Sequence, residues 1–322
     1  MIVSWFVGPK GLVRNEASDD AAIRGAVWID LCDPSKEDEV RIEELCAIDI
    51  PTRAEMQEIE ASSRLYREDG ALFVTATMLV KTETESPEST AVTFVLTRER
   101  LITIRYAEPW SFRTFATRAS KSGAQNAEQA FCEIMDTTIE RLADMLELVA
   151  MELDHLSHQV FRRHHPNKSQ QASLDLQKAI IKTGSCGLIC SKVRESLIDK
   201  NRIVSYAESH HEWSSSEHQV RLKGLLRDIQ TLSDHATFTA SKIQFMLDAT
   251  LGLINIEQNR IIKIFSIAAV IFMPPTLVAS IYGMNFVHMP ELDKVWGYPM
   301  ALGIMLAAVG GTLYYFRRRH WM

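Results

Sequence analysis

The oxygen donors that follow one apolar run are the residues best suited to chemistry in this chain. Asn285 carries a side-chain amide, and Gly283, two residues earlier, offers a backbone carbonyl free of side-chain obstruction. Small divalent cations such as magnesium release bound water reluctantly and usually keep several waters inside a protein site. A ring of amide and carbonyl oxygens can hydrogen-bond those waters without replacing them. The pattern therefore predicts a site for a hydrated divalent cation.

The apolar run before Asn285 carries a stripe of mostly small or polar residues at helical spacing. Small and polar positions in a membrane span usually face protein or water rather than lipid. The stripe either lines a water-filled path or packs two helices together, and periodicity alone does not decide between these alternatives. It contains no Asp, Glu, His or Cys, so a dehydrated divalent cation would find no strong ligands there. Its members are Asn259, Ile262, Ser266, Ala269, Met273, Thr276 and Ser280.

Two apolar runs must position these residues, one at about 261–282 and one at about 298–316. Each is long enough to cross a bilayer as a helix, which takes about 20 residues. Lys263 is the one charge in the first run, and the second run has none. Pro274 and Pro275 remove backbone hydrogen bonds in the first run, which predicts a kink. Two spans cannot enclose a water-filled path, so any conduction requires several copies of the chain.

Charges flanking the two runs predict their orientation. Arg317, Arg318 and Arg319 follow the second run, whereas the loop at 283–297 carries Glu291, Asp293 and a single Lys294. Because positive residues stay on the cytoplasmic side, both termini are expected in the cytoplasm and the loop outside.

Composition assigns the remaining residues to a soluble part. The chain has 322 residues and a net charge of -6, and its mean hydropathy of -0.06 is far too low for a protein that is mostly membrane. Mild acidity argues against nucleic acid as a partner. The sequence has no Gly-rich phosphate loop and no recognisable nucleophile. We therefore expect no enzyme and no organic cofactor.

The expected fold is an α+β cytoplasmic domain with a long stalk helix that continues into a two-helix transmembrane hairpin. Residues 1–125 alternate short β-branched runs with helical signals and form the α/β lobe. Residues 126–258 are helical, and 259–322 contain the hairpin with its basic tail. No proline interrupts 217–273, which predicts one continuous helix over 217–281, about 100 Å long at 1.5 Å per residue.

Residues around Asn285 resemble the CorA family of magnesium transporters, most closely over 217–322. The matching segments are Tyr282-Gly283-Met284-Asn285-Phe286, Met289-Pro290-Glu291-Leu292, Trp296-Gly297-Tyr298-Pro299, Arg317-Arg318-Arg319-His320-Trp321, and the stretch from Gln258 to Ser266.

The resemblance implies a funnel-shaped homopentamer whose first span lines a central pore. Gly283, Met284 and Asn285 would select the ion, with Glu291 in the outer loop. The family's cytoplasmic pore asparagine falls on Asn259 and its pore threonine on Thr276. Its hydrophobic constriction falls on Ile262, Phe265 and Met273, and Phe265 departs from the leucine often found there. Ser266 and Ser280 complete the implied pore lining. The same resemblance implies a multi-pass protein of the bacterial inner membrane.

Family resemblance further implies passive transport of magnesium, and of cobalt and nickel, driven by the membrane potential. Members close when internal magnesium binds carboxylates between neighbouring cytoplasmic domains, so magnesium is both substrate and regulatory ligand. Asp228 and Asp234 are the candidates here, because they lie among Leu225, Ile229 and Leu232, where a neighbour could approach. Plain solvated charges are the alternative for these two aspartates.

Two other functions remain open on sequence grounds. One is a zinc transporter of the same superfamily, although Met289-Pro290-Glu291-Leu292 favours the magnesium branch. The other is a two-span membrane sensor or anchor whose soluble domain binds a ligand or partner. That function would leave the stripe and Asn285 without a role.

Overall fold

The computed structural model describes residues 1–15, 19–58, 60–84, 86–162, 169–210, 216–284, 289–290 and 294–319. The described chain divides into two units. Met1–His165 and Gln177–Asp248 form the first, and Pro166–Leu176 with Ala249–Met322 form the second.

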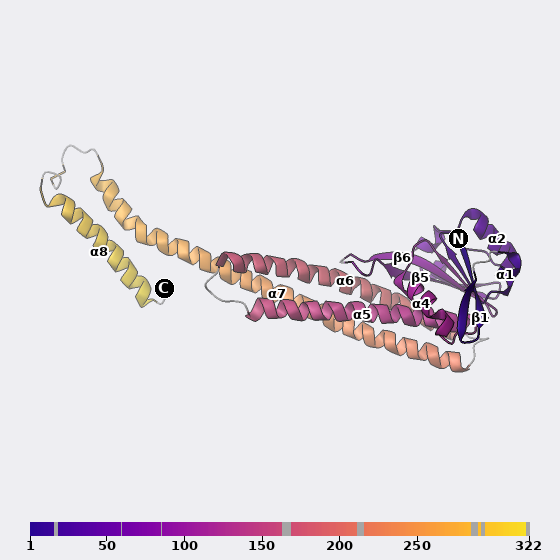
Figure 1. The fold of residues 1–322 in the computed structure, drawn as a ribbon. Coiled ribbons are helices and arrows are strands. Elements are labelled where there is room, and N and C mark those ends of the chain that lie inside the picture. Colours follow the sequence, from indigo (N-terminus) through magenta and orange to yellow (C-terminus); the bar gives the residue numbers. More distant parts are fainter. Residues whose placement is uncertain are drawn as a thin grey trace. The chain divides into compact units, whose positions relative to one another are not determined.

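A seven-stranded mixed sheet organises the first unit (Figure 1). The strand order is β2-β1-β3-β7-β6-β5-β4, and β3 pairs in parallel with β7 while the other neighbours are antiparallel. The strands are β1 (Ile2–Gly8), β2 (Gly11–Asn15), β3 (Trp28–Cys32), β4 (Leu65–Glu68), β5 (Ala71–Val80), β6 (Glu88–Leu96) and β7 (Leu101–Arg105).

Helices cover both faces of this sheet because its central strands are apolar on both sides. Along β5, Leu72 and Val74 join the core that also contains Phe112 and Phe131 from the long-helix side. Phe73, between them, joins the opposite core with Ile23 and Ile42 of the short helices. Those helices are α1 (Asp20–Gly25) and α2 (Lys36–Cys46). The first unit also contains α3 (Ala61–Arg64), α4 (Trp110–Arg118) and the short 3-10 turns Glu55–Gln57 and Ala119–Lys121.

The start of α2 shows how the sequence sets an element boundary. Ser35 accepts a hydrogen bond from the Asp38 backbone, and the Asp38 carboxylate accepts one from the Ser35 backbone. This reciprocal capping box satisfies two amide groups that a helix start otherwise leaves unpaired.

Three long helices carry the chain away from the sheet. They are α5 (Ala127–Arg162), α6 (Ser169–Ser209) and α7 (Ser216–Tyr282). Buried side chains recur on them at helical spacing, as Leu142, Leu146 and Val149 do on α5. The helix predicted over 217–281 is confirmed as α7, with 67 residues.

A buried charge cluster fastens α6 to β5. Lys200 is fully buried, and its ammonium donates to the backbone carbonyl of Thr77 at 2.6 Å and to the Asp199 carboxylate at 3.1 Å. Asp199 also accepts from the Thr77 backbone amide at 2.7 Å. Burial lowers the pKa of Lys200, and the nearby Asp199 carboxylate opposes that shift. Both backbone groups of Thr77 are thereby bound to adjacent residues of one helix.

The last part of α7 and helix α8 (Gly297–Arg318) form most of the second unit. Both helices are long and apolar enough to cross a membrane, with mean hydropathies of 2.1 and 1.4 over their most apolar stretches. This matches the two spans predicted from the sequence. Figure 1 shows α8 running antiparallel to the end of α7.

Candidate functional site

The α8-facing side of α7 is the least exposed part of its apolar segment. Partly buried positions recur every three or four residues on α7, at Ile267, Ile271, Pro274, Val278 and Tyr282. A matching stripe on α8 consists of Gly297, Ala301, Met305, Ala308, Thr312 and Phe316. Because these two stripes have lower exposure than their neighbours, they are the sides on which the antiparallel helices shield each other.

The predicted pore stripe lies on the opposite side of α7. At 100° per residue, its centre is about 150° away from the centre of the α8-facing side. All its described members are exposed in the single chain, including Met273 at 66% and Phe265 at 71%. We call this the uncovered side of α7, and it comprises Asn259, Ile262, Phe265, Ser266, Ala269, Met273, Thr276 and Ser280. The stripe therefore does not pack against α8. Within a single chain, this excludes the alternative in which the stripe only packs the two apolar helices together.

The helix continues through Pro274 and Pro275. Neither proline has an N–H, so the carbonyls of Val270 and Ile271 lose their usual donors. Directly after Pro275, the Thr276 hydroxyl donates to the backbone carbonyl of Phe272, one turn earlier, at 2.7 Å. The uncovered side thus carries a hydroxyl next to a stretch of weakened backbone pairing. Such stretches are tolerated in a membrane where they line a cavity.

The end of α7 positions the first part of the Gly-Met-Asn motif. The Gly283 amide donates to the carbonyl of Ala279 at 2.9 Å, and the Met284 amide donates to Ile281 at 3.3 Å. A Cβ at Gly283 would lie 3.0 Å from the Ala279 carbonyl oxygen, closer than most real Cβ contacts. Glycine therefore lets the chain stay close to the last helical turn. Asn285 and Glu291 lie outside the described residues.

Asp228 and Asp234 are not brought together by the structure. Both are exposed on the first part of α7, and six helical residues place them about 120° apart around the axis. Asp234 accepts a hydrogen bond from Gln230 at 3.2 Å. Among the described residues, no group of three His, Cys, Asp or Glu side chains is arranged to hold a metal ion. An ion bound at either aspartate would need further ligands from water or another chain.

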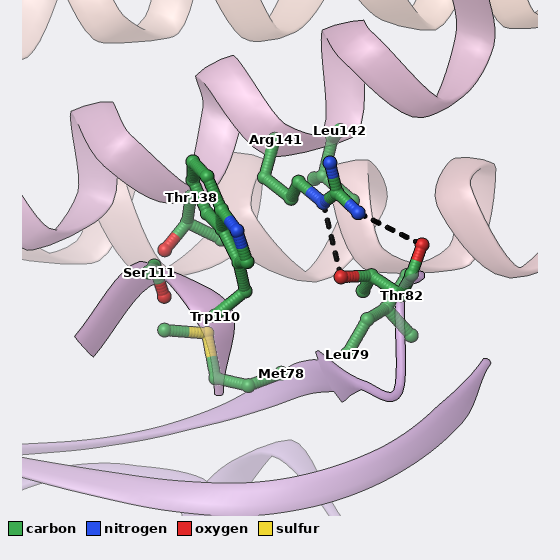
Figure 2. A pocket seen from close by; sticks show the side chains of 8 residues that line it. All are labelled: Met78, Leu79, Thr82, Trp110, Ser111, Thr138, Arg141 and Leu142. Carbon is green, nitrogen blue, oxygen red and sulfur yellow. Dashed lines mark hydrogen bonds between the residues drawn. The ribbon is translucent and has the colours of Figure 1, made fainter. Parts of the chain in front are cut away.

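Cavities in the soluble unit show no comparable chemistry. Figure 2 shows a small cavity beside α5, where the Arg141 guanidinium donates to the Thr82 hydroxyl at 3.0 Å and to the Thr82 carbonyl at 2.9 Å. Its volume of about 10 Å³ barely admits one water. A larger groove of about 680 Å³ lies between α5 and α6. Its Lys182 already binds Glu152 at 2.8 Å.

The α8-facing stripe was missed in the sequence analysis. Its signal was present as small residues at spacings of four and seven, namely Gly297, Ala301, Ala308 and Thr312. Such residues let two membrane helices approach closely. These small residues would have identified α8 as a close packing partner of α7, so that the small and polar stripe of α7 was not needed for that packing.

Comparisons with known proteins give consistent results over the whole chain. A model of the family described as CorA-like Mg2+ transporter protein matches residues 24–318. The magnesium transport proteins CorA of Pasteurella multocida (strain Pm70) and Escherichia coli (strain K12) are each 34% identical to the chain. Both alignments span 324 residues and cover 100% of this chain and 100% of the relative.

A solved structure with the same architecture is the complete CorA magnesium transporter from Methanocaldococcus jannaschii. It aligns with a TM-score of 0.73 and 18% identity, covering 100% of this chain and 99% of that one. This likeness supports the fold: a soluble domain, a long helix and C-terminal helices.

Proposed function

Because the chain belongs to the family of CorA-like Mg2+ transporter proteins, we propose that it carries Mg2+ passively across a bacterial inner membrane. Five copies would surround one path, each contributing the uncovered side of α7. The observation that carries this proposal is that this side is exposed while α8 covers the opposite one. Both termini would be cytoplasmic, and cobalt and nickel would also pass.

The driving force would be the membrane potential and the concentration gradient. A divalent ion gains about 4.6 kcal/mol in crossing 100 mV, twice the value for one charge. This energy supports accumulation of about a thousandfold or more at equilibrium. Described parts of the two apolar segments hold no Asp, Glu or His that could relay protons.

Selection would take place where α7 ends. Gly283, Met284 and Asn285 would form a ring of oxygen acceptors that hydrogen-bond the waters of a hydrated ion. Further in, Asn259, Ser266, Thr276 and Ser280 would supply polar groups, and Ile262, Phe265 and Met273 would form an apolar constriction that closes by dewetting. Glu291 would add negative charge at the outer entrance.

Transport into liposomes tests this function. Purified full-length protein should take up Mg2+ when the interior is made negative, because no other energy source is needed. Native mass measurement of the same sample should give five chains. If uptake in the absence of a Mg2+ gradient does not depend on the membrane potential, the passive mechanism is contradicted. Preference for Zn2+ over Mg2+ would favour a zinc transporter, and no uptake of either ion would favour a sensor or anchor.

Regulation would depend on Asp228 and Asp234 of neighbouring chains. Internal Mg2+ bound between chains would hold the stalk parts of α7 together, and repulsion without it would let them separate. We expect the double variant Asp228→Asn/Asp234→Asn to need an internal Mg2+ concentration about tenfold higher for half-maximal inhibition of uptake. A coupling free energy of about 1.4 kcal/mol is typical of linked sites. Glu217→Gln/Asp248→Gln, elsewhere on the same helix, is the matched control. An unchanged midpoint for the first variant would exclude these aspartates as the sensor.

A further inference from the structure

Basic side chains gather at one end of the hairpin, opposite the loop. Arg260 and Lys263 lie near the start of the apolar part of α7, and Arg317 and Arg318 end α8. About 22 residues separate Arg260 from the end of α7, which equals the 22 residues of α8. Antiparallel helices of equal length place these four side chains at the same level. All four are exposed, and we call them the basic patch.

The helical phase of the patch keeps it away from the proposed ion path. Arg260 lies within about 20° of the centre of the α8-facing side, and Lys263 lies near its edge, about 100° from the centre of the uncovered side. On α8, Arg317 and Arg318 lie more than about 100° from the stripe that faces α7. Positive side chains on the uncovered side would repel a cation. None of the four side chains lies on the uncovered side, and Arg317 and Arg318 point away from α7 towards the surrounding membrane.

Side chains next to the patch are typical of a membrane surface. Tyr314 and Tyr315 are exposed one turn before the arginines, at 69% and 58%. Ile261 and Ile264, beside Arg260 and Lys263, are exposed apolar residues. Tyrosine concentrates where hydrocarbon meets headgroups. The patch therefore lies at headgroup level if the apolar parts of both helices lie in hydrocarbon.

One buried acid bounds the patch on the soluble side. Glu257 is 6% exposed, and one of its oxygens lies 3.9 Å from the Arg260 guanidinium. Its other oxygen has no hydrogen-bond partner among the described residues. One carboxylate against four cations leaves a net positive surface. A complementary partner would be a membrane surface whose anionic headgroups lie at the level of the basic patch.

We propose that the basic patch binds the headgroups of anionic phospholipids, and that this binding is separate from ion transport. Phosphate oxygens accept charge-assisted hydrogen bonds from guanidinium and ammonium groups. A lipid is favoured over a free phosphate because its acyl chains would lie along the exposed apolar side chains next to the patch. Each Lys or Arg adds to such binding independently while it lies within a Debye length of the surface.

Lipid binding to the delipidated full-length protein tests this proposal without any transport measurement. Native mass spectrometry would compare retained phosphatidylglycerol with retained phosphatidylcholine of the same acyl chains. The wild type should prefer phosphatidylglycerol, and 0.5 M salt should abolish most of that preference. Arg317→Gln/Arg318→Gln and Arg260→Gln/Lys263→Gln should each weaken phosphatidylglycerol binding by about thirtyfold, with helix content and chain number unchanged.

Lys223→Gln/Arg227→Gln is the matched control, because it removes two exposed positive charges from the same helix within the soluble unit. This variant should keep the wild-type preference. The proposal is overturned if the wild type binds both lipids equally, if the patch variants keep its preference, or if excess inorganic phosphate displaces the lipid. Because the readout is binding, failure here leaves the transport proposal intact, and absence of transport leaves this result intact.

Discussion

Alanine in place of Asn285 should reduce Mg2+ uptake to the level of liposomes without protein. The amide oxygen would accept hydrogen bonds from the waters of the hydrated ion, and a ring of five such oxygens would be lost at once. Each such hydrogen bond contributes about 0.5–1.5 kcal/mol, so the loss of several is more than a tenfold effect. The motif follows the last turn of α7, where the Met284 amide still bonds to Ile281. Folding of α7 should therefore not depend on the Asn285 side chain.

Asn201→Ala is the control for this experiment, since Asn201 is exposed on α6 in the soluble unit. Both variants should have the chain number and unfolding temperature of the wild type. Only the Asn285 variant should lose uptake. Uptake by Asn285→Ala within a factor of about two of the wild type would remove Asn285 from the selection of the ion.

Glycine in place of Met273 should raise uptake at high internal Mg2+, where the proposed mechanism would have the wild type closed. Met273 is exposed on the uncovered side of α7 together with Ile262 and Phe265. Apolar constrictions gate by excluding water, and a glycine would widen and wet this one. We expect a leak at least about tenfold above the wild type, measured as Mg2+ flux into liposomes loaded with Mg2+.

Ile264→Gly controls for the intrinsic cost of glycine in a helix, about 1 kcal/mol. Ile264 is also exposed in the single chain, at 57%, but it lies about 160° around the helix from the centre of the uncovered side. It should show wild-type closure. A similar leak in both glycine variants would mean that helix weakening, rather than the constriction, causes the flux.

Elements with long periodic patterns were predictable from the sequence. Helices α5 and α7 match the expected runs closely, because apolar positions recur over many turns without a break. Gly184 and Gly187 lie inside α6 and do not interrupt it. A Cβ at Gly187 would meet Ile243 at 3.6 Å. The close packing of α6 against α7 at this position outweighs the low helix propensity of glycine.

Short edge strands were the main misses in the soluble part. Strands β2 and β4 have five and four residues and carry polar side chains such as Arg14 and Arg67, so neither shows a clear alternation. The first residues of β6 are also polar, and this strand begins at Glu88. Glu88, Ser89 and Thr90 pair with the end of β5. Pairing with β5 therefore makes these residues a strand, although their polar composition is typical of a loop.

Sequence reasoning grouped the small and polar residues of α7 on one side, but it did not show what covers the opposite side. Their spacing is a property of one helix and can be read locally, which is why Ile262, Met273 and Thr276 fall on one side as expected. The partner of the other side depends on α8, a separate segment. Asp228 and Asp234 were chosen from neighbouring leucines, and those leucines do not say which direction each carboxylate faces. The family resemblance from the motif is confirmed by the match over 24–318.

The single parallel pair in the sheet has a consequence for how fast the protein folds. Strands β3 and β7 align Trp28 with Leu101 and Asp30 with Thr103, so their pairing closes a loop of about 70 residues. Local helices form in about a microsecond or less, whereas pairings this distant in sequence form late and slowly. The indole of Trp28 donates to the Thr103 hydroxyl across this pair and stacks on Trp5 at 4.9 Å. Tryptophan fluorescence should therefore change in the slowest phase of refolding, after the helical signal has recovered.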